Sequence, residues 1–266
     1  MTVDWYTGDA TYDTVLTVGF VFAACTLAGS LVIRSPYGRF ASERFGLSLD
    51  PRLGWWLMEL PATVVFAVFF LRIDADRVHQ VTPVVLAGIW ALHYLNRGWF
   101  FPLSLRVAPG RKGSFSVTVL LAGLAVTAAH GYLNATWFTT YGDHLDRSWL
   151  HDPRFLVGLV VYLAGFALIV SSERIVRNLR PKGGGGEARY AVPYGGGFRW
   201  VSSPAYLGEL LAWSGFALLT WGLAGVLILL ITAANLVPRA LATHRWYREQ
   251  FPDYPGDRKA LIPGLL

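Results

Sequence analysis

Seven apolar segments constrain the fold of this chain more than any other feature of its sequence. The hydrocarbon core of a bilayer needs about 20 apolar residues in a helix, and only helices and closed barrels satisfy their backbone hydrogen bonds there. The segments lie at about residues 14–33, 53–71, 81–101, 115–136, 155–172, 206–219 and 223–237. They predict an all-α integral membrane protein, in which residues 1–266 form a single membrane domain with about seven transmembrane helices.

The composition agrees with this class. Hydrophobic residues make up 54% of the chain and charged residues 15%, whereas a soluble domain has about 45–50% and about 25%. One part of the count is open. The sixth and seventh segments share residues 206–237, which is short for two full spans, so one long tilted helix and a total of six is the alternative.

The distribution of positive charge predicts the orientation of the helices. If the N-terminus lies outside, 19 of the 23 Lys and Arg residues fall in the loops 34–52, 97–114 and 173–203 and in the tail 239–266. Cytoplasmic segments carry such an excess, so we expect the N-terminus outside and the C-terminus in the cytoplasm. The net charge of +6 then indicates no nucleic-acid partner. The basic loops serve orientation alone, or they also bind a polyanion such as a dinucleotide phosphate.

The sequence lacks the residues or motifs that several kinds of functional site require. Cys25 is the single cysteine, which excludes an internal disulfide and a cysteine-based metal cluster. The sequence contains no P-loop, no HExxH and no serine nucleophile elbow. The six histidines are scattered along the chain. We therefore expect no metal site.

Glu59 is a carboxylate inside the second apolar segment. An acid at this depth is costly unless it is paired or protonated, so it faces the bundle interior or a wet cavity. Such a residue either makes a structural hydrogen bond to a neighbouring helix or takes part in function. Pro61, two residues later, loosens the local backbone. We favour a functional role because acids within membrane spans are rare.

Polar residues also gather where the third segment ends. His93 and Arg97 are four residues apart and share a helix face. Tyr94 points elsewhere, and by itself it is typical of an interface anchor. The loop 173–203 contains two glycine runs, but no strand precedes them, so they do not form a dinucleotide-binding fingerprint. In the tail, aromatic and basic residues alternate, and we interpret it as a packed cap over the cytoplasmic mouth.

Together these motifs strongly resemble the steroid 5α-reductases (3-oxo-5α-steroid 4-dehydrogenases), from about Tyr37 to Leu266, and suggest a member of bacterial type. The motifs are Glu59-Leu60-Pro61, His93-Tyr94-x-x-Arg97, Gly131-Tyr132-Leu133-Asn134, Arg180-Pro181, Tyr194-Gly195-Gly196, Gly208-Glu209 and Asp253-Tyr254-Pro255 with Arg258 to Pro263. The stretch from Ser203 to Gly208 also looks like the membrane isoprenylcysteine carboxyl methyltransferases.

The resemblance implies an NADPH-dependent reduction of the Δ4 double bond of a 3-oxo steroid. Tyr94 and Glu59, the latter as a protonated acid, would then donate hydrogen bonds to the carbonyl oxygen, on which negative charge develops. The basic loops and the tail would cap the cofactor. The residues that the resemblance assigns to cofactor contacts are Tyr37, Arg97, Glu173, Arg180, Glu209, His244, Tyr247 and Arg258. Trp55 and Trp213 stand four residues from Glu59 and Glu209, and they are candidates for walls of the substrate pocket.

Two other functions compete with this hypothesis. An S-adenosylmethionine-dependent methyltransferase would share the C-terminal signature but gives no reason for Glu59 or for His93-Tyr94. A small transporter would use the buried acid along its path, yet the sequence shows no pair of repeated halves. The expected partners are an apolar steroid-like substrate and membrane lipid, with a monomer favoured. The expected membrane is the cytoplasmic membrane if the source is bacterial and the endoplasmic reticulum if it is eukaryotic.

Overall fold

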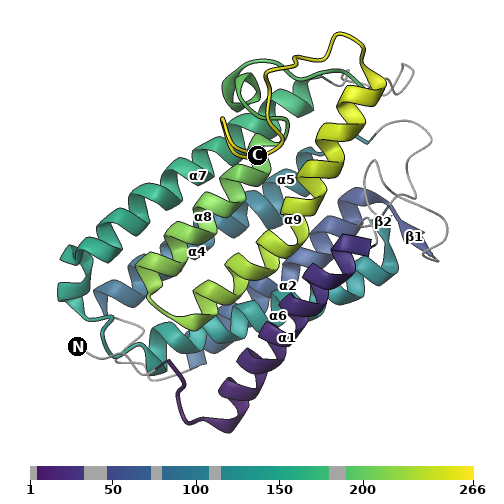
Figure 1. Ribbon diagram of the computed structural model, residues 1–266. Coiled ribbons are helices and arrows are strands. Elements are labelled where there is room, and N and C mark those ends of the chain that lie inside the picture. Colours follow the sequence, from purple (N-terminus) through teal and green to yellow (C-terminus); the bar gives the residue numbers. More distant parts are fainter. Residues whose placement is uncertain (1–4, 33–46, 73–79, 108–114, 180–189) are drawn as a thin grey trace.

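The computed structural model describes residues 5–32, 47–72, 80–107, 115–179 and 190–266 (Figure 1). The predicted residues Tyr37 and Arg180 lie outside these ranges. The described part is an all-α bundle, and seven of its helices have more than ten residues. The helices are α1 (Ala10–Val32), α2 (Pro51–Arg72), α4 (Val81–Tyr94), α5 (Phe101–Ser104), α6 (Val117–Thr136), α7 (Pro153–Asn178), α8 (Pro204–Thr220) and α9 (Leu223–Gln250).

Shorter elements complete the described chain. Two π-helical turns, η3 (Leu95–Phe100) and η4 (Trp137–Tyr141), continue α4 and α6, and two 3-10 turns are η5 (Arg147–His151) and η6 (Gly196–Arg199). The sequence predicted no strands, but β1 (Ser48–Leu49) and β2 (Phe115–Ser116) form a two-residue antiparallel pair. The pair forms through backbone hydrogen bonds between two segments far apart in the sequence. The pattern of apolar side chains therefore could not predict it.

Five helical segments in the described residues are long and apolar enough to cross a bilayer. They are Ala10–Ser30, Pro51–Leu71, Val117–Tyr141, Pro153–Asn178 and Leu223–Gln250. The other two predicted spans are built differently. One is a continuous helical run from α4 through η3 to α5, and the other is α8, which has only 17 residues.

The alternative of one long helix over residues 206–237 is wrong. Helix α8 ends at Thr220 and α9 begins at Leu223. Trp221 between them has φ of 45°, in the left-handed region that ends helices. Two other helices outrun the predicted segments. Helices α7 and α9 continue to Asn178 and Gln250, because the backbone hydrogen bonds of a helix do not depend on whether its side chains are apolar or charged.

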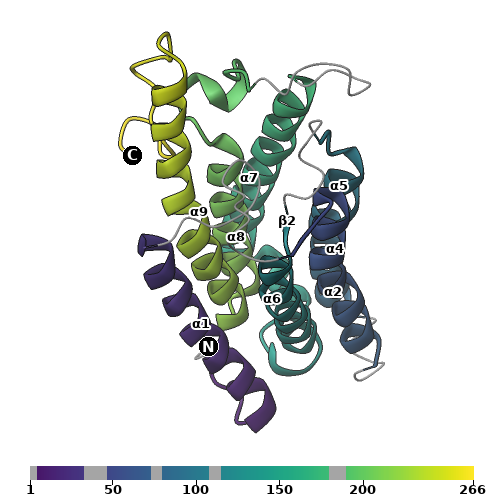
Figure 2. The same cartoon turned by 90° about the vertical axis from the view of Figure 1, so that its right-hand side faces the viewer.

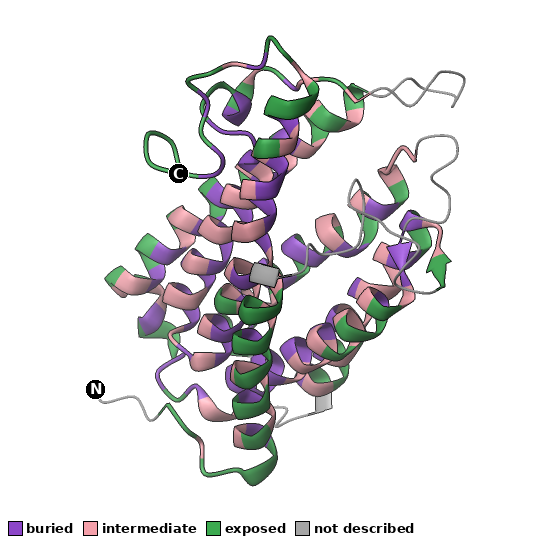
Figure 3. Ribbon diagram, turned by 45° about the vertical axis from the view of Figure 1, so that its right-hand side comes forward, coloured by how far each residue is buried: buried purple, intermediate pink, exposed green. Residues whose placement is uncertain are grey.

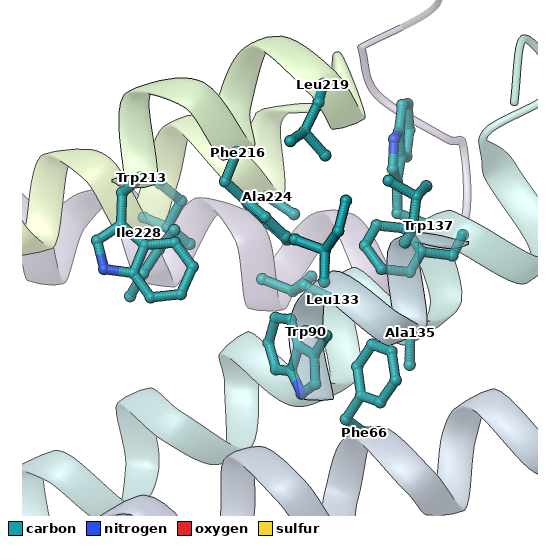
Figure 4. Close-up of a cluster of buried hydrophobic side chains, with 14 of the residues drawn as sticks. Phe66, Trp90, Leu133, Ala135, Trp137, Trp213, Phe216, Leu219, Ala224 and Ile228 are labelled. Carbon is teal, nitrogen blue, oxygen red and sulfur yellow. The ribbon is translucent and has the colours of Figure 1, made fainter. Parts of the chain in front are cut away.

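The helices form two groups (Figure 2). In the first group α7, α8 and α9 pack together, and α1 packs against α9. In the second group α2 packs against α6, and α4 lies beside them. Aromatic side chains such as Trp90, Trp213 and Phe216 fill the space between the groups (Figure 4). The outer surfaces carry apolar side chains such as Val18 and Val21 of α1, which are exposed (Figure 3). This is the burial pattern expected of a bundle in lipid.

Glycines set the contact between α7 and α8. Gly158 and Gly165 of α7 face Gly215 and Gly208 of α8, and the two positions on each helix are seven residues apart. A Cβ at Gly158 would lie 2.7 Å from the carbonyl oxygen of Gly215, and a Cβ at Gly208 would lie 2.7 Å from that of Gly165. Small residues let backbones approach closely where the hydrophobic effect does not drive association. The pairing runs in opposite sequence directions, so the two helices are antiparallel.

We expect Gly165→Leu to destabilise the bundle by about 1–3 kcal/mol, because the new side chain would meet the backbone of α8 at Ala212 and Gly208. Thermal unfolding in detergent, followed by tryptophan fluorescence, measures the effect. Gly88→Leu is the matched control, since no atom of the described residues lies within 4 Å of a Cβ placed there. Equal losses in both variants would contradict the glycine contact.

Candidate active site

Three charged side chains from three helices meet in the bundle interior. The Arg97 guanidinium lies between two buried carboxyl groups, with its Nε 3.1 Å from Glu59 Oε1 and its Nη1 3.6 Å from Glu209 Oε1. Trp213 donates a hydrogen bond to Glu209 Oε2 at 3.1 Å. His93 Nε2 lies 3.9 Å from the same oxygen. Residues that the sequence predicted separately for catalysis and cofactor contact therefore form one connected cluster.

A π-helical turn places Arg97 in this cluster. The amide of Phe101 donates to the carbonyl of Asn96, five residues back, and Pro102 follows without an amide hydrogen. A turn of this kind is frequent at functional sites because it turns side chains away from their α-helical direction. Gly98 lies in the same turn, and a Cβ there would be 3.4 Å from Glu59 Cβ. The small residue thus lets α2 approach the turn.

Tyr94 is buried among aromatic side chains, and one of them, Trp213, is bonded to Glu209 of the charged cluster. Its ring centroid lies 4.7 Å from that of Trp90 and 6.5 Å from that of Trp213. The phenol interacts electrostatically with Glu59, Glu209 and Arg97. The two predicted catalytic side chains therefore border one interior region, from α2 and α4.

A cavity of about 320 Å³ opens beside the charged cluster. Its lining includes five residues that the sequence predicted: Trp55, Arg97, Glu173, Glu209 and Tyr247. The ring centroid of Trp55 lies 4.6 Å from the Arg97 guanidinium carbon, so this wall also holds the arginine. Within the described residues, the lining does not include Glu59, Tyr94, Trp213, His244 or Arg258.

Three arginines that the sequence analysis did not single out also line the cavity: Arg106, Arg177 and Arg239. Arg177 donates to Ser104 Oγ at 3.1 Å, and Arg106 donates to the Arg177 carbonyl at 3.1 Å. Arg239 donates to the Tyr206 hydroxyl at 3.0 Å. Arg177 and Arg239 face the cavity from helices α7 and α9, and the loop and tail boundaries predicted from sequence concealed this. Arg106 follows α5 and reaches the cavity through its bond to Arg177.

His244 and Arg258 hold the C-terminal tail on the bundle. Ser202 Oγ lies 2.6 Å from His244 Nδ1 and 2.7 Å from the Tyr254 hydroxyl. Buried Arg258 donates to the Pro193 carbonyl at 3.2 Å. The tail also exchanges backbone hydrogen bonds with the loop that leads into α8, from Lys259 to Trp200 and from Ser202 to Lys259. The tail is therefore a packed cap, and the Ser202 centre of this network had no signal in the sequence.

We expect Arg97→Gln to destabilise the protein by roughly 3 kcal/mol, because two buried carboxyl groups would lose their shared cation. Chemical unfolding in detergent measures the loss. The double variant Arg97→Gln with Glu209→Gln should recover part of it, since the second substitution removes a carboxylate that Arg97 neutralises. A double variant no more stable than the single one would mean that Arg97 acts through packing alone.

Comparison with known proteins shows the family to which the chain belongs. Residues 113–266 match the family model described as 3-oxo-5-alpha-steroid 4-dehydrogenase. The chain is 36% identical to 3-oxo-5-alpha-steroid 4-dehydrogenase 1 of Rattus norvegicus over 248 residues, which cover 93% of this chain and 92% of that protein. It is 35% identical to steroid 5-alpha-reductase DET2 of Gossypium hirsutum, with 92% and 93% covered, and 31% identical to 3-oxo-5-alpha-steroid 4-dehydrogenase 1 of Homo sapiens, with 87% and 86% covered. The chain belongs to the steroid 5α-reductase family.

Proposed function

We propose that this chain reduces the Δ4 double bond of 3-oxo steroids to give 5α-reduced 3-oxo steroids, with NADPH as the reductant. As a member of its family it is an oxidoreductase that acts on CH–CH groups. The observation that carries the proposal is the Glu59–Arg97–Glu209 cluster, which joins a buried tyrosine on one side to an arginine-lined cavity on the other. A polyanionic cofactor and an apolar substrate would meet at this cluster.

The cavity fits the cofactor by its chemistry. Arg106, Arg177 and Arg239 supply guanidinium groups, which suit phosphate oxygens. The buried hydroxyls of Ser172 and Ser203 line the same cavity. Tyr247 adds an aromatic wall, and Glu173 and Glu209 add acceptors. His244 and Arg258 would contribute by holding the capping tail, and Tyr37 and Arg180 are proposed as further cofactor contacts from the family resemblance.

The substrate carbonyl would be held by Tyr94 and Glu59. When bound, NADPH would supply the hydride that the β-carbon of the enone accepts, while the α-carbon takes a proton. Negative charge would develop on the carbonyl oxygen as the hydride arrives. The Tyr94 hydroxyl and a protonated Glu59 would donate hydrogen bonds to this oxygen, and preorganised donors of this kind lower the barrier most in a dry site. Trp55 and Trp213 would wall the substrate and the nicotinamide.

Charge balance favours a proton on Glu59. One guanidinium cannot neutralise two buried carboxylates, so the cluster with both ionised would carry a net negative charge in an apolar interior. Glu209 receives hydrogen bonds or ion-pair contacts from Arg97, Trp213 and His93. Arg97 contacts Glu59 through Oε1, which leaves Oε2 to carry the proton toward the substrate.

The proposed topology has seven membrane crossings, with the N-terminus outside and the C-terminus in the cytoplasm. The capping tail, the loop before α8 and the end of α7 lie at one end of the bundle, and this end carries the cavity arginines (Figure 1). We propose a monomer in contact with membrane lipid. For a member of bacterial type the membrane is the cytoplasmic membrane, and for a eukaryotic member it is the endoplasmic reticulum.

We expect Glu59→Gln and Tyr94→Phe each to lower the turnover number by about 10²–10³-fold, because each removes or weakens one donor to the carbonyl oxygen. NADPH oxidation by purified protein with a 3-oxo-Δ4 steroid measures this. NADPH binding and thermal stability should stay close to those of the wild type. Tyr132→Phe is the control, since Tyr132 packs against Tyr12 and Phe69 outside the charged cluster. Full activity in both site variants would overturn the assigned roles.

Cofactor choice separates the proposed reductase from the methyltransferase alternative. We expect titration calorimetry to show NADPH binding by the detergent-solubilised protein and no binding of S-adenosylmethionine. NADH should bind more weakly, because it lacks the 2′-phosphate that an arginine would pair with. Binding of S-adenosylmethionine alone would reverse the proposal. If NADPH binds, its oxidation with a panel of 3-oxo-Δ4 steroids and linear enones would define the substrate.

A further inference from the structure

Two buried serine hydroxyls in the cavity wall make no hydrogen bond within the described structure. Ser172 is 1% exposed and Ser203 is 6% exposed, and both residues line the cavity. Within the described part of the chain, neither Oγ has a hydrogen-bond partner. A buried hydroxyl without a partner destabilises the folded protein, so hydroxyls that persist in a cavity wall indicate a ligand that completes them.

Within the residues that the structure describes, neither serine makes the hydrogen bond that a serine in its position usually makes to the helix backbone. A serine in a helix commonly donates to a carbonyl three or four residues back, as Ser171 does to Leu168 at 3.2 Å. Its neighbour Ser172 makes no such bond to any described residue. Ser203 is the N-cap of α8, where a hydroxyl normally accepts from the first turn, but no such cap bond forms in the described structure.

The two serines stand at the same level of the bundle. Helices α7 and α8 are antiparallel, and a Cβ at Gly208 would lie 2.9 Å from the Ile169 amide nitrogen. Ser172 is three residues after Ile169, and Ser203 is five residues before Gly208, so both lie on the same side of that contact. Glu209, which Arg97 joins to Glu59, lines the same cavity.

Charged groups of both signs line the cavity around the two serines. Ser172 is followed directly by Glu173, and Arg239 donates to the Tyr206 hydroxyl, three residues after Ser203. Arg177 stands five residues beyond Ser172, about 7.5 Å further along the axis of α7, and Arg106 is bonded to it there. The serines therefore lie between the level of Glu209 and this pair of arginines, which suits phosphates. Two neutral hydroxyls in that place suit a neutral group with both donors and acceptors.

We propose that Ser172 and Ser203 form a hydrogen-bonding subsite for the nicotinamide riboside half of the cofactor. This inference rests on the proposed reductase function, because the hydride donor has to lie next to the cluster that holds the substrate carbonyl. Each hydroxyl can donate to and accept from a carboxamide or a ribose hydroxyl. The subsite orients the cofactor, with its nicotinamide toward Arg97 and its phosphates toward Arg106 and Arg177.

The test measures binding of three probes to the full-length protein in detergent: NADPH, reduced nicotinamide mononucleotide and 2′,5′-ADP. We expect Ser172→Ala and Ser203→Ala each to weaken NADPH and the reduced mononucleotide by about ten-fold, the usual effect of one lost hydrogen bond. Binding of 2′,5′-ADP should not change. Ser171→Ala is the matched control on the same helix and should bind all three probes like the wild type.

Stability without ligand gives a second and opposite readout. Replacing an unpartnered hydroxyl by a methyl group removes a desolvation cost, so both alanine variants should melt at or above the wild-type temperature. A lower melting temperature would show a structural role and overturn the subsite. Unchanged NADPH binding, or a loss confined to 2′,5′-ADP, would overturn it as well. A wild-type protein that binds no NADPH would instead overturn the proposed function itself.

Discussion

The Arg97 guanidinium between Glu59 and Glu209 is the interaction on which the site depends. Two carboxyl groups cannot stay in an apolar bundle without a partner, and a single cation from the π-helical turn serves both. This contact ties α2 to α8 through the end of α4. It therefore sets the distance between the aromatic region around Tyr94 and the polar cavity, and the proposed chemistry needs these two regions to adjoin.

Two different kinds of packing support this contact. On one side the glycines of α7 and α8 bring the backbones close, which places Glu209 and the serines of the cavity wall. On the other side the C-terminal tail closes the bundle through Ser202, His244 and Tyr254. The first depends on the absence of side chains and the second on a polar network. Both fix residues that line the cavity, such as Glu209 on α8 and Ser202 beside the tail.

Prediction from sequence succeeded where one physical rule decided the outcome. Apolar length located the starts of the seven long helices to within four residues, and the rarity of buried acids pointed to Glu59. It was less accurate at helix ends, where charged side chains indicate a loop but backbone hydrogen bonds can continue the helix. The ends of α7 and α9 were predicted from the first charges, but the helices continue into the polar region. Arg177 and Arg239 therefore looked like members of a loop and the tail, when they line a cavity from these helices. Arg106 does lie in a loop, and its hydrogen bond to α7 places it at the cavity.

By itself the sequence determined the membrane class, the approximate helices and the residue types of the site, since these follow from local apolar length and from the cost of burying charge. The tertiary structure decided which of these residues meet. Arg97 reaches two carboxyl groups because a π-turn redirects it, and Ser172 faces the cavity while Ser171 faces outward because α7 and α8 pack in one register. Such relations depend on the distance and rotation between helices, which are set by contacts between residues far apart in the sequence.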